Sequence, residues 1–362
     1  MLNVKHLNQI YLYTALVFLN ISLSSAGDAQ ETVVNQSNNP ILQSFSWRGI
    51  GPIGQGGRVD DLAVSKENPH VYFVGFATAG LWKTKNNGTT FKAVFETHPT
   101  ASVGAVAISD ADADIVWVGT GEANNRQSSS FGAGVYLSTD AGETFSLVGL
   151  EETQSISRIL THPTDPNVAW VAANGHLFGA NPERGVYKTA DRGSSWEKVL
   201  YVDENTGATD LIIDPSNPDV LFAATYQRRR TACCFVGGGP GSGIWHSSDG
   251  GKEWSKVEGN GLPNGTMGRI ALATSQANPN IIYAQIEVAQ DKEESLSSEE
   301  SSKYQQLAQE DALPPDTEYN GIWRSTDKGS TWEFRSNENG RPMYFSQIRV
   351  DPMDPNLVYV VD

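Results

Sequence analysis

Residues 134–145 read GVYLSTDAGETF, and the chain repeats this pattern four more times. A Gly, an aliphatic residue and an aromatic come first, followed by Ser or Thr, by Asp or Asn, by Gly and by a second aromatic. The Ser or Thr positions are Thr84, Ser138, Thr189, Ser247 and Ser325. The Asp or Asn positions are Asn86, Asp140, Asp191, Asp249 and Asp327. The closing aromatics are Phe91, Phe145, Trp196, Trp254 and Trp332.

Each copy has the chemistry of a tight turn between two strands. The Asp or Asn oxygen can accept hydrogen bonds from backbone N–H groups of the turn, and the Gly that follows can adopt a positive φ. The closing aromatic is expected to pack between neighbouring sheets and to bury a large area there. The five Asp or Asn side chains are therefore predicted to be structural.

A second, weaker repeat precedes a hydrophobic strand in each unit. Asn-Pro or Asp-Pro occurs five times with its Pro four residues before an aromatic, and Asp112-Ala113 is a degenerate copy. These aromatics are Phe73, Trp117, Trp170, Phe222, Tyr283 and Tyr359. Repeats of roughly fifty residues, made of short strands and turns, are typical of one propeller blade each. The sequence predicts an all-β fold, a β-propeller of four-stranded antiparallel blades with five complete blades and an incomplete sixth.

The repeated pattern is identified as the Asp-box, also called the bacterial neuraminidase repeat, so residues 46–362 resemble Asp-box propellers. The chain is also similar to the sortilin N-terminal domain of large secreted bacterial proteins. That similarity rests on residues 47–52 (WRGIGP), 119–122 (GTGE), 175–177 (GHL) and 237–243 (GGGPGSG). Sialidases and xyloglucanases share the Asp-box, so the resemblance implies a fold and leaves activity open.

The N-terminal sequence indicates where the protein is located, and its net charge argues against one class of partner. Residues 1–26 combine a basic start, an apolar run and a small-residue cleavage site, which predicts a signal peptide. Residues 27–45 are polar and are expected to form a flexible leader. We expect a secreted or periplasmic protein with no membrane span in the mature chain. The net charge of −16 argues against nucleic acid as a partner. No cofactor or metal is expected.

The two cysteines, Cys233 and Cys234, are adjacent. They cannot join distant parts of the fold, and a bond between neighbours would be strained. Two thiols in a loop, or a local bridge, are favoured over a redox or metal role.

The length of the connections predicts the functional face. In an antiparallel meander the Pro turns and the Asp-boxes share one face, whereas second-to-third-strand connections and links between blades share the other. Four connections on that second face are long: residues 121–134, 174–185, 227–243 and 287–321. Binding groups concentrate in such variable loops, so we predict that this insertion face binds the ligand.

The insertions supply the candidate ligand-binding residues. These are Glu122, Asn125, Arg126, His176, Arg184, Arg228, Arg229 and Arg230. The arginines can recognise carboxylate, sulfate or phosphate groups. The alternative is that the arginines hold the long loops by bonding to backbone carbonyls and acids, and that Glu122 and His176 shape their loops in the same way.

Two acidic stretches are interpreted as structural features without a binding role. Residues 287–318 form an acidic insertion that is expected to be solvated, with helix-compatible composition over 298–311. Residues 110–114 (DADAD) could hold calcium, but they align with the Pro turns and are read as a turn.

The sequence favours a binding module over an enzyme. No paired carboxylates, nucleophile-and-base set or metal motif is recognisable, and no catalytic residue is assigned. Xyloglucanases have a catalytic Asp where this chain has Ala77. We predict a peptide, protein or glycan ligand, with a polysaccharide-acting hydrolase of xyloglucanase or sialidase type as the alternative.

The sixth blade is expected to lack strands. Its first strand is predicted around residues 345–350 and its second around 357–361. Residues 47–50 can supply a closing fourth strand, which still leaves one strand missing. We therefore expect the chain to be part of a longer protein, and poorly soluble or self-associating when expressed alone.

Overall fold

The computed structural model describes residues 40–41, 57–126, 129–289 and 320–361. The chain divides into two units, 1–56 and 57–362, and every strand named below belongs to the second. The predicted signal peptide, residues 47–50 and nearly all of the predicted leader and of the acidic insertion lie outside the described residues.

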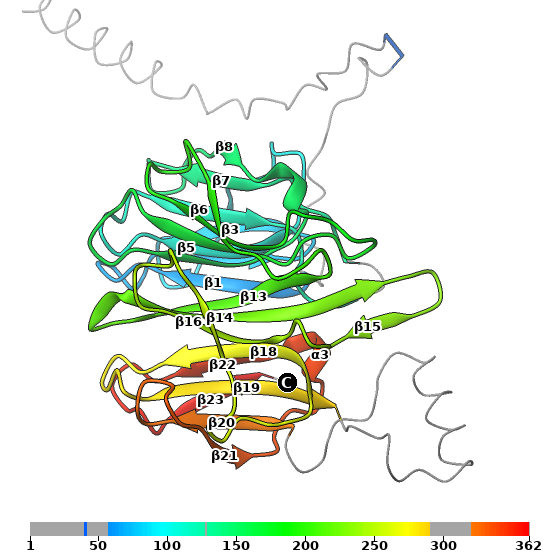
Figure 1. Cartoon of the computed structure of the whole chain (residues 1–362). Coiled ribbons are helices and arrows are strands. Elements are labelled where there is room, and N and C mark those ends of the chain that lie inside the picture. Colours follow the sequence, from blue (N-terminus) through cyan, green and yellow to red (C-terminus); the bar gives the residue numbers. More distant parts are fainter. Residues whose placement is uncertain (1–39, 42–56, 127–128, 290–319, 362) are drawn as a thin grey trace, which may run out of the picture. The chain divides into compact units, whose positions relative to one another are not determined.

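The second unit consists of six antiparallel sheets, here called blades 1 to 6 (Figure 1). Blade 1 contains β1 (Val59–Val64), β2 (Tyr72–Phe76), β3 (Gly80–Thr84) and β4 (Lys92–Ala93). Blade 2 contains β5 (Val103–Ile108), β6 (Val116–Thr120), β7 (Val135–Ser138) and β8 (Ser146–Gly149). Blade 3 contains β9 (Ile156–Thr161), β10 (Ala169–Ala173), β11 (Gly185–Thr189) and β12 (Glu197–Leu200), preceded by the short 3-10 helix η1 (Glu151–Thr153).

The second half of the chain continues the series. Blade 4 contains β13 (Thr206–Asp214), β14 (Asn217–Arg230), β15 (Phe235–Gly237), β16 (Gly243–Ser247) and β17 (Ser255–Val257). Blade 5 contains β18 (Thr266–Thr274), β19 (Ile282–Ala289), β20 (Gly321–Ser325) and β21 (Glu333–Ser336). Blade 6 contains β22 (Gln347–Val350) and β23 (Val358–Val361), preceded by α3 (Pro342–Phe345).

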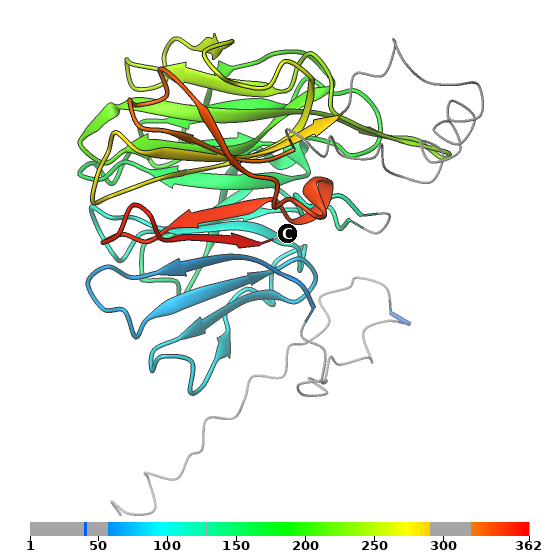
Figure 2. The ribbon, with the colours of Figure 1, turned by 90° about the horizontal axis from the view of Figure 1, so that it is seen from below.

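The first strands of the blades surround a common axis. Strands β1, β5, β9, β13, β18 and β22 each contact the next one along the chain. Seen from below, blade 6 lies between blade 5 and blade 1 (Figure 2). The predicted β-propeller is therefore confirmed.

A β-bulge marks the first strand of blades 1 to 5. The register shifts between Val59 and Asp61 in β1, and at matching places in the other four strands. A bulge inserts an unpaired residue and redirects its side chain. The residues at these shifts are Asp60, Gly104, Ser157, Thr209, and the pair Gly268 and Arg269. Most of them are polar, and they determine what lies at the axis.

The repeated turns have the predicted chemistry. The Oδ1 atom of Asp140 accepts the backbone N–H groups of Glu143 and Thr144 at 3.0 and 2.9 Å. Ser138 Oγ donates to Asp140 Oδ1 at 2.7 Å and accepts the N–H of Gly142 at 2.8 Å. These bonds hold the pKa of Asp140 well below its usual range, the Thr144 hydroxyl contributing most. One feature was not anticipated, since Ala141 also has a positive φ of 57° beside 80° for Gly142.

The repeated turns pack each blade onto the previous one. A Cβ added to Gly142 of blade 2 would lie 2.5 Å from the ring of Phe73 in blade 1. Equivalent contacts join Gly251 to Trp170 and Gly329 to Phe222. At these three positions the glycine is therefore required by the aromatic of the previous blade as well as by its own φ, whereas a Cβ at Gly193 would meet Val148 of blade 2.

One interface lacks this contact, which corrects the expectation that every closing aromatic is buried. Phe91 of blade 1 is 43% exposed and Tyr359 of blade 6 is 56% exposed. At the other interfaces, the closing aromatic of one blade faces the Pro-turn aromatic of the previous blade. Phe91 and Tyr359 occupy these two positions. Among the described residues, no ring packs between blades 6 and 1 in this way, so both aromatic side chains remain about half exposed to solvent.

Three further predictions need correction. The arginine run was placed in a loop, but β14 extends through Arg230 and forms a hairpin with β15. The sixth blade begins with α3 rather than with a strand at residue 345, because Pro342 occupies the first position of that helix. Helix was expected only in the acidic insertion, whereas α3 and η1 lie elsewhere.

Candidate binding face and axial cavity

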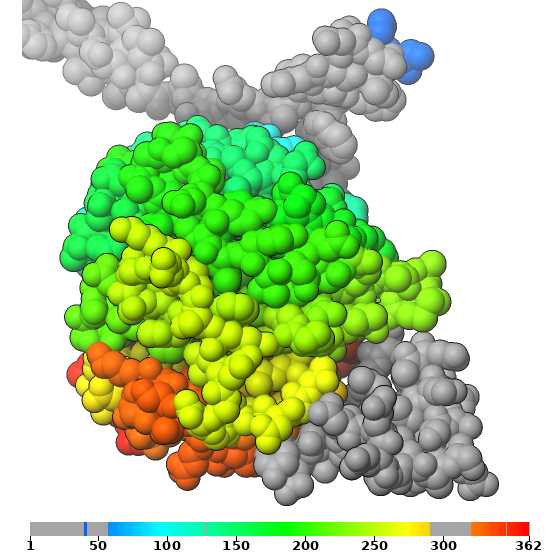
Figure 3. Space-filling view, viewed as in Figure 1, coloured from blue at the N-terminus to red at the C-terminus, as the bar shows by residue number. Residues whose placement is uncertain are grey.

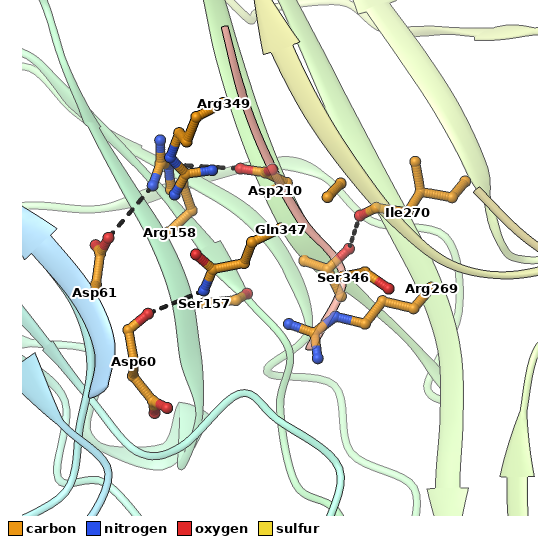
Figure 4. Close-up of a pocket in the computed structure, with 12 residues that line it drawn as sticks. Asp60, Asp61, Ser157, Arg158, Asp210, Arg269, Ile270, Ser346, Gln347 and Arg349 are labelled. Atoms are coloured by element: carbon orange, nitrogen blue, oxygen red, sulfur yellow. Dashed lines mark hydrogen bonds and ion pairs between the residues drawn. The ribbon is translucent and has the colours of Figure 1, made fainter. Parts of the chain in front are cut away.

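An ion-pair network crosses the axis in the cavity drawn in Figure 4. Arg158 on β9 lies 3.6 Å from Asp61 on β1 and 3.5 Å from Asp210 on β13. Each carboxylate also binds the next blade, because Asp61 accepts the N–H of Val106 at 3.0 Å and Asp210 that of Leu272 at 2.9 Å. Burial acts to lower the pKa of Arg158, but Asp210 and Asp61 outweigh it and raise that pKa.

A second arginine completes the network. Arg349 on β22 lines the same cavity, and the charge of Arg158, followed by burial, lowers its pKa. The cavity is narrow, and its volume is about 20 Å³. Two guanidinium groups thus face two carboxylates, and the charges at this level compensate each other. Neither Asp61 nor Asp210 is left as a free catalytic carboxylate.

Asp60 lies beside this network and is the unusual acid of the site. Its Oδ1 accepts a hydrogen bond from Asn124 Nδ2 at 2.9 Å, whereas Oδ2 is buried without a partner among the described residues. Burial, and then the charge of Glu122, raise the pKa of Asp60 to about 8, against the opposing charges of Arg269 and Arg58. Asp60 is therefore protonated at neutral pH.

Glu122 was predicted to bind ligand, and the structure places it inside the protein. Its two oxygens accept Arg58 Nε at 2.8 Å and Nη2 at 2.7 Å, and its side chain has no exposed surface. A bidentate pair of this kind fixes both side chains. Glu122 thus links the first insertion, residues 121–134, to Arg58, which directly precedes β1.

Asn125 and Arg228 meet in the same buried layer. Arg228 Nη1 donates to Asn125 Oδ1 and to the carbonyl of Ala123, each at 2.9 Å. Asn125 Nδ2 donates to Tyr226 Oη at 3.0 Å and to the carbonyl of Met343 at 2.7 Å. Burial lowers the pKa of Arg228 to about 9. These contacts fix the first insertion against β14 and α3.

Arg184 and His176 form a separate group in blade 3. Arg184 is fully buried and donates to Asn181 Oδ1 and to the carbonyls of Asn174 and His176. Burial lowers its pKa to about 10. His176 Nε2 lies 2.9 Å from the carbonyl oxygen of Glu152. Both side chains make contacts with backbone carbonyls of residues 152–176, and ligand binding by them stays a prediction.

Three candidates lie nearer the surface. Arg126 Nη1 donates to the hydroxyl of Tyr344 at 2.9 Å. Arg229 and Arg230 are half-buried on the β14–β15 hairpin, and Nε and Nη2 of Arg229 have no hydrogen-bond partner among the described residues. The guanidinium of Arg230 lies 5.5 Å from the ring centroid of Phe235. Ligand binding by these residues stays a prediction.

Exposed aromatics on the insertion face were missed by the sequence analysis. Phe131, Phe178 and Tyr201 are 56%, 46% and 46% exposed, and they lie in or beside the connections of blades 2 and 3. None of them is among the predicted ligand-binding residues. The signal was present in the sequence, because these rings lie off the repeat positions that Asp-box aromatics occupy.

Further sequence features also lie within the described residues. Ala77 is fully buried, with its N–H bonded to the carbonyl of Arg58. Residues 110–114 form a turn in which the N–H of Asp114 binds Asp112 Oδ1 at 3.1 Å. In the described part of the chain, no group of acids, His and Cys is arranged to hold a metal ion, and no helix is long and apolar enough to cross a membrane.

Residues 133–314 match the Sortilin-Vps10 family model, described as sortilin, neurotensin receptor 3. The match covers half of the sequence. The chain belongs to this family. The resemblance to the sortilin propeller is therefore confirmed.

Curated relatives are xyloglucanases. The chain is 29% identical over 192 residues to xyloglucanase Xgh74A of Acetivibrio thermocellus, covering 49% of this chain and 19% of that enzyme. It is 23% identical over 268 residues to a xyloglucanase of a Paenibacillus species, covering 67% of this chain and 25% of the enzyme. The chain thus spans about a fifth to a quarter of the length of these relatives.

Solved structures of GH74 enzymes share the fold. An ancestral GH74 enzyme aligns with a TM-score of 0.57 at 20% identity, covering 86% of this chain and 35% of the enzyme. The GH74 xyloglucanase from Xanthomonas campestris aligns with a TM-score of 0.56 at 15% identity, covering 83% and 43%. At these identities the alignments support the propeller architecture.

Proposed function

We propose that this propeller is a binding module that takes a peptide or protein segment with acidic side chains on its insertion face. The observation that carries the proposal is a small sheet at the outer end of β14. Phe178 bridges to Arg230, and Arg230 pairs with Phe235 on β15. Residues paired across strands present their side chains on one face, so the three form a row of ring, guanidinium and ring.

This row suits an acidic peptide for two reasons. A guanidinium between aromatic rings pairs with carboxylates while the rings contact apolar side chains. In the described sheets β15 pairs only with β14, so its other edge can accept an extended segment through backbone hydrogen bonds. Arginine concentrates here in a chain whose net charge is −16.

A pocket adjoins the base of the hairpin. Gly239, Pro240 and Ser242 form one wall, and residues 256–259 and 263–267 form the rest. Its volume is about 310 Å³, and it is open to solvent. The hairpin protrudes from the body of the ring (Figure 3). A ligand on the row can therefore extend into this pocket.

Selection from a displayed library of random peptides tests the proposal. We expect acidic sequences to be enriched, and their binding to fall at least tenfold in a variant that combines F178A, R229Q and R230Q. The control is F91A with K92Q, which removes an exposed aromatic and an exposed cation from the opposite face. Equal losses in both variants, or no enrichment of acidic peptides, would contradict the proposal.

Hydrolysis of a polysaccharide is the second candidate. It is favoured by the xyloglucanase relatives and by Asp60, since a protonated carboxyl at neutral pH is what a general acid needs. Its test is turnover of xyloglucan, β-glucans and sialosides. Activity that disappears in a folded D60N variant would establish the hydrolase and displace the binding module.

A further inference from the structure

Two arginines from distant parts of the chain lie against one tyrosine ring on the insertion face. Arg126 belongs to the insertion of blade 2, and Arg341 directly precedes α3, which lies beside that insertion (Figure 2). The guanidinium carbon of each arginine lies 5.5 Å from the ring centroid of Tyr344. The two carbons therefore cannot be further apart than twice that distance. Folding brings two positive charges together around one side chain.

The tyrosine and one of the arginines are held in place by hydrogen bonds. The carbonyl of Tyr344, which is 6% exposed, accepts Arg269 Nη1 at 2.7 Å, and its N–H donates to the carbonyl of Arg341 at 3.0 Å. Arg126 donates from Nη1 to the Tyr344 hydroxyl at 2.9 Å and from its backbone N–H to Ser129 Oγ at 3.1 Å. Groups that are already ordered lose less freedom when a ligand binds.

Both guanidinium groups keep donors for a ligand. Within the described part of the chain, Nε and Nη2 of Arg126 make no hydrogen bond, and the Arg341 guanidinium contacts only the ring. No described carboxylate forms an ion pair with either arginine, and Glu122, the one acid of residues 121–134, is bound by Arg58. Arg126 is half-buried and Arg341 is exposed, so solvent reaches both. An anion at this place offsets the repulsion between the two charges.

We propose that Arg126 and Arg341 together bind one tetrahedral oxyanion, a sulfate or phosphate group, beside Tyr344. A guanidinium presents its N–H groups as a planar fork that matches two oxygens of such an anion. Sulfate and phosphate have enough oxygens to engage both forks, whereas a carboxylate fills one. The site shares no residue with the row on the β14–β15 hairpin and does not rest on the proposed function.

The test is isothermal titration calorimetry of the full chain with inorganic sulfate, inorganic phosphate and acetate at neutral pH and constant ionic strength. We expect sulfate or phosphate to bind about tenfold more tightly than acetate, and the tighter of the two identifies the group that the site takes. R126Q and R341Q should each weaken that binding about tenfold, because both arginines hold the same anion. Y344F keeps both charges but removes the hydroxyl that holds Arg126, so it should weaken binding about 2- to 5-fold.

The matched control combines K66Q with R335Q, which removes two charges from exposed side chains that do not contact Tyr344. This variant should keep the native affinity for the tighter anion. R126K with R341K keeps both charges but loses the planar forks, so it should bind less tightly than the native chain even where a Gln variant is unstable. The proposal fails if neither tetrahedral anion binds, or if acetate binds as tightly. It also fails if only one of the two arginines affects binding, or if the control loses as much affinity as R126Q and R341Q.

Discussion

Arg158 should be the side chain on which the closure of the ring depends most, and R158M tests this. Its guanidinium lies 3.5–3.6 Å from carboxylates of blades 1 and 4, which are 8% and 10% exposed. At an effective dielectric constant of about 20, each contact corresponds to roughly 4–5 kcal/mol of Coulomb attraction before desolvation. Removing one partner of a buried pair typically costs about 3–5 kcal/mol.

The expected loss is smaller than that range. Arg158 is itself 24% exposed, each Asp keeps two backbone N–H donors, and Arg349 remains in the cavity. We therefore expect R158M to lower the free energy of unfolding by about 2–4 kcal/mol in urea titrations at pH 7.

A surface pair provides the control. Arg335 lies 3.1 Å from Glu333, and the two side chains are 46% and 70% exposed. R335M should cost less than about 0.5 kcal/mol. If R158M also cost less than about 0.5 kcal/mol, the axial network would not hold the blades together, and the reasoning from burial and distance would be refuted.

Three further predictions concern single sites. The pKa of Asp60 is raised to about 8, so its contribution to stability is present at pH 4 and is lost as pH rises towards 8; D60N should remove this slope from unfolding titrations. D191A or D249A should each lower the free energy of unfolding by roughly 1–3 kcal/mol, while ligand affinity is unchanged, because Asp191 accepts the backbone N–H and the hydroxyl of Ser195 and Asp249 accepts the backbone N–H groups of Lys252 and Glu253. Exported protein should begin near Gly27, and mass spectrometry that finds an intact Met1 segment would exclude cleavage.

The fold was predictable because it depends on residues that recur. Asp140 and Gly142 satisfy the same turn wherever the pattern appears, and the glycine fits the aromatic of the previous blade. A turn of this kind is local, so its hydrogen bonds can be inferred from spacing alone. The exposed ring of Phe91 could not be inferred, because it depends on what packs against blade 1 rather than on its own turn.

The candidate site was only partly predictable, because burial of an arginine is a tertiary property. Arg228, Arg229 and Arg230 are three consecutive residues of one type, yet Arg228 is buried whereas Arg229 and Arg230 are half-buried. Arg228 is buried against Asn125, whereas Arg230 shares a face with Phe235. Alternation along the strand puts Arg228 and Arg230 on one face and Arg229 on the other, and Arg228 differs from Arg230 because it lies where Asn125 of residues 121–134 packs against β14. Read as a loop, the run gives no reason to distinguish them.

The distinctive chemistry of this propeller lies in residues that differ between blades at equivalent positions of the repeat. At the bulge positions, blade 2 has Gly104, blades 3 and 4 have Ser157 and Thr209, and blade 1 has Asp60. The hydroxyls of Ser157 and Thr209 bind carbonyls of the next blade, and so act as structural links. A carboxyl at the same position has no such carbonyl partner among the described residues and remains protonated instead. Positions that are equivalent by symmetry thus differ in their chemistry, because Asp60 alone among these four residues has a titratable side chain.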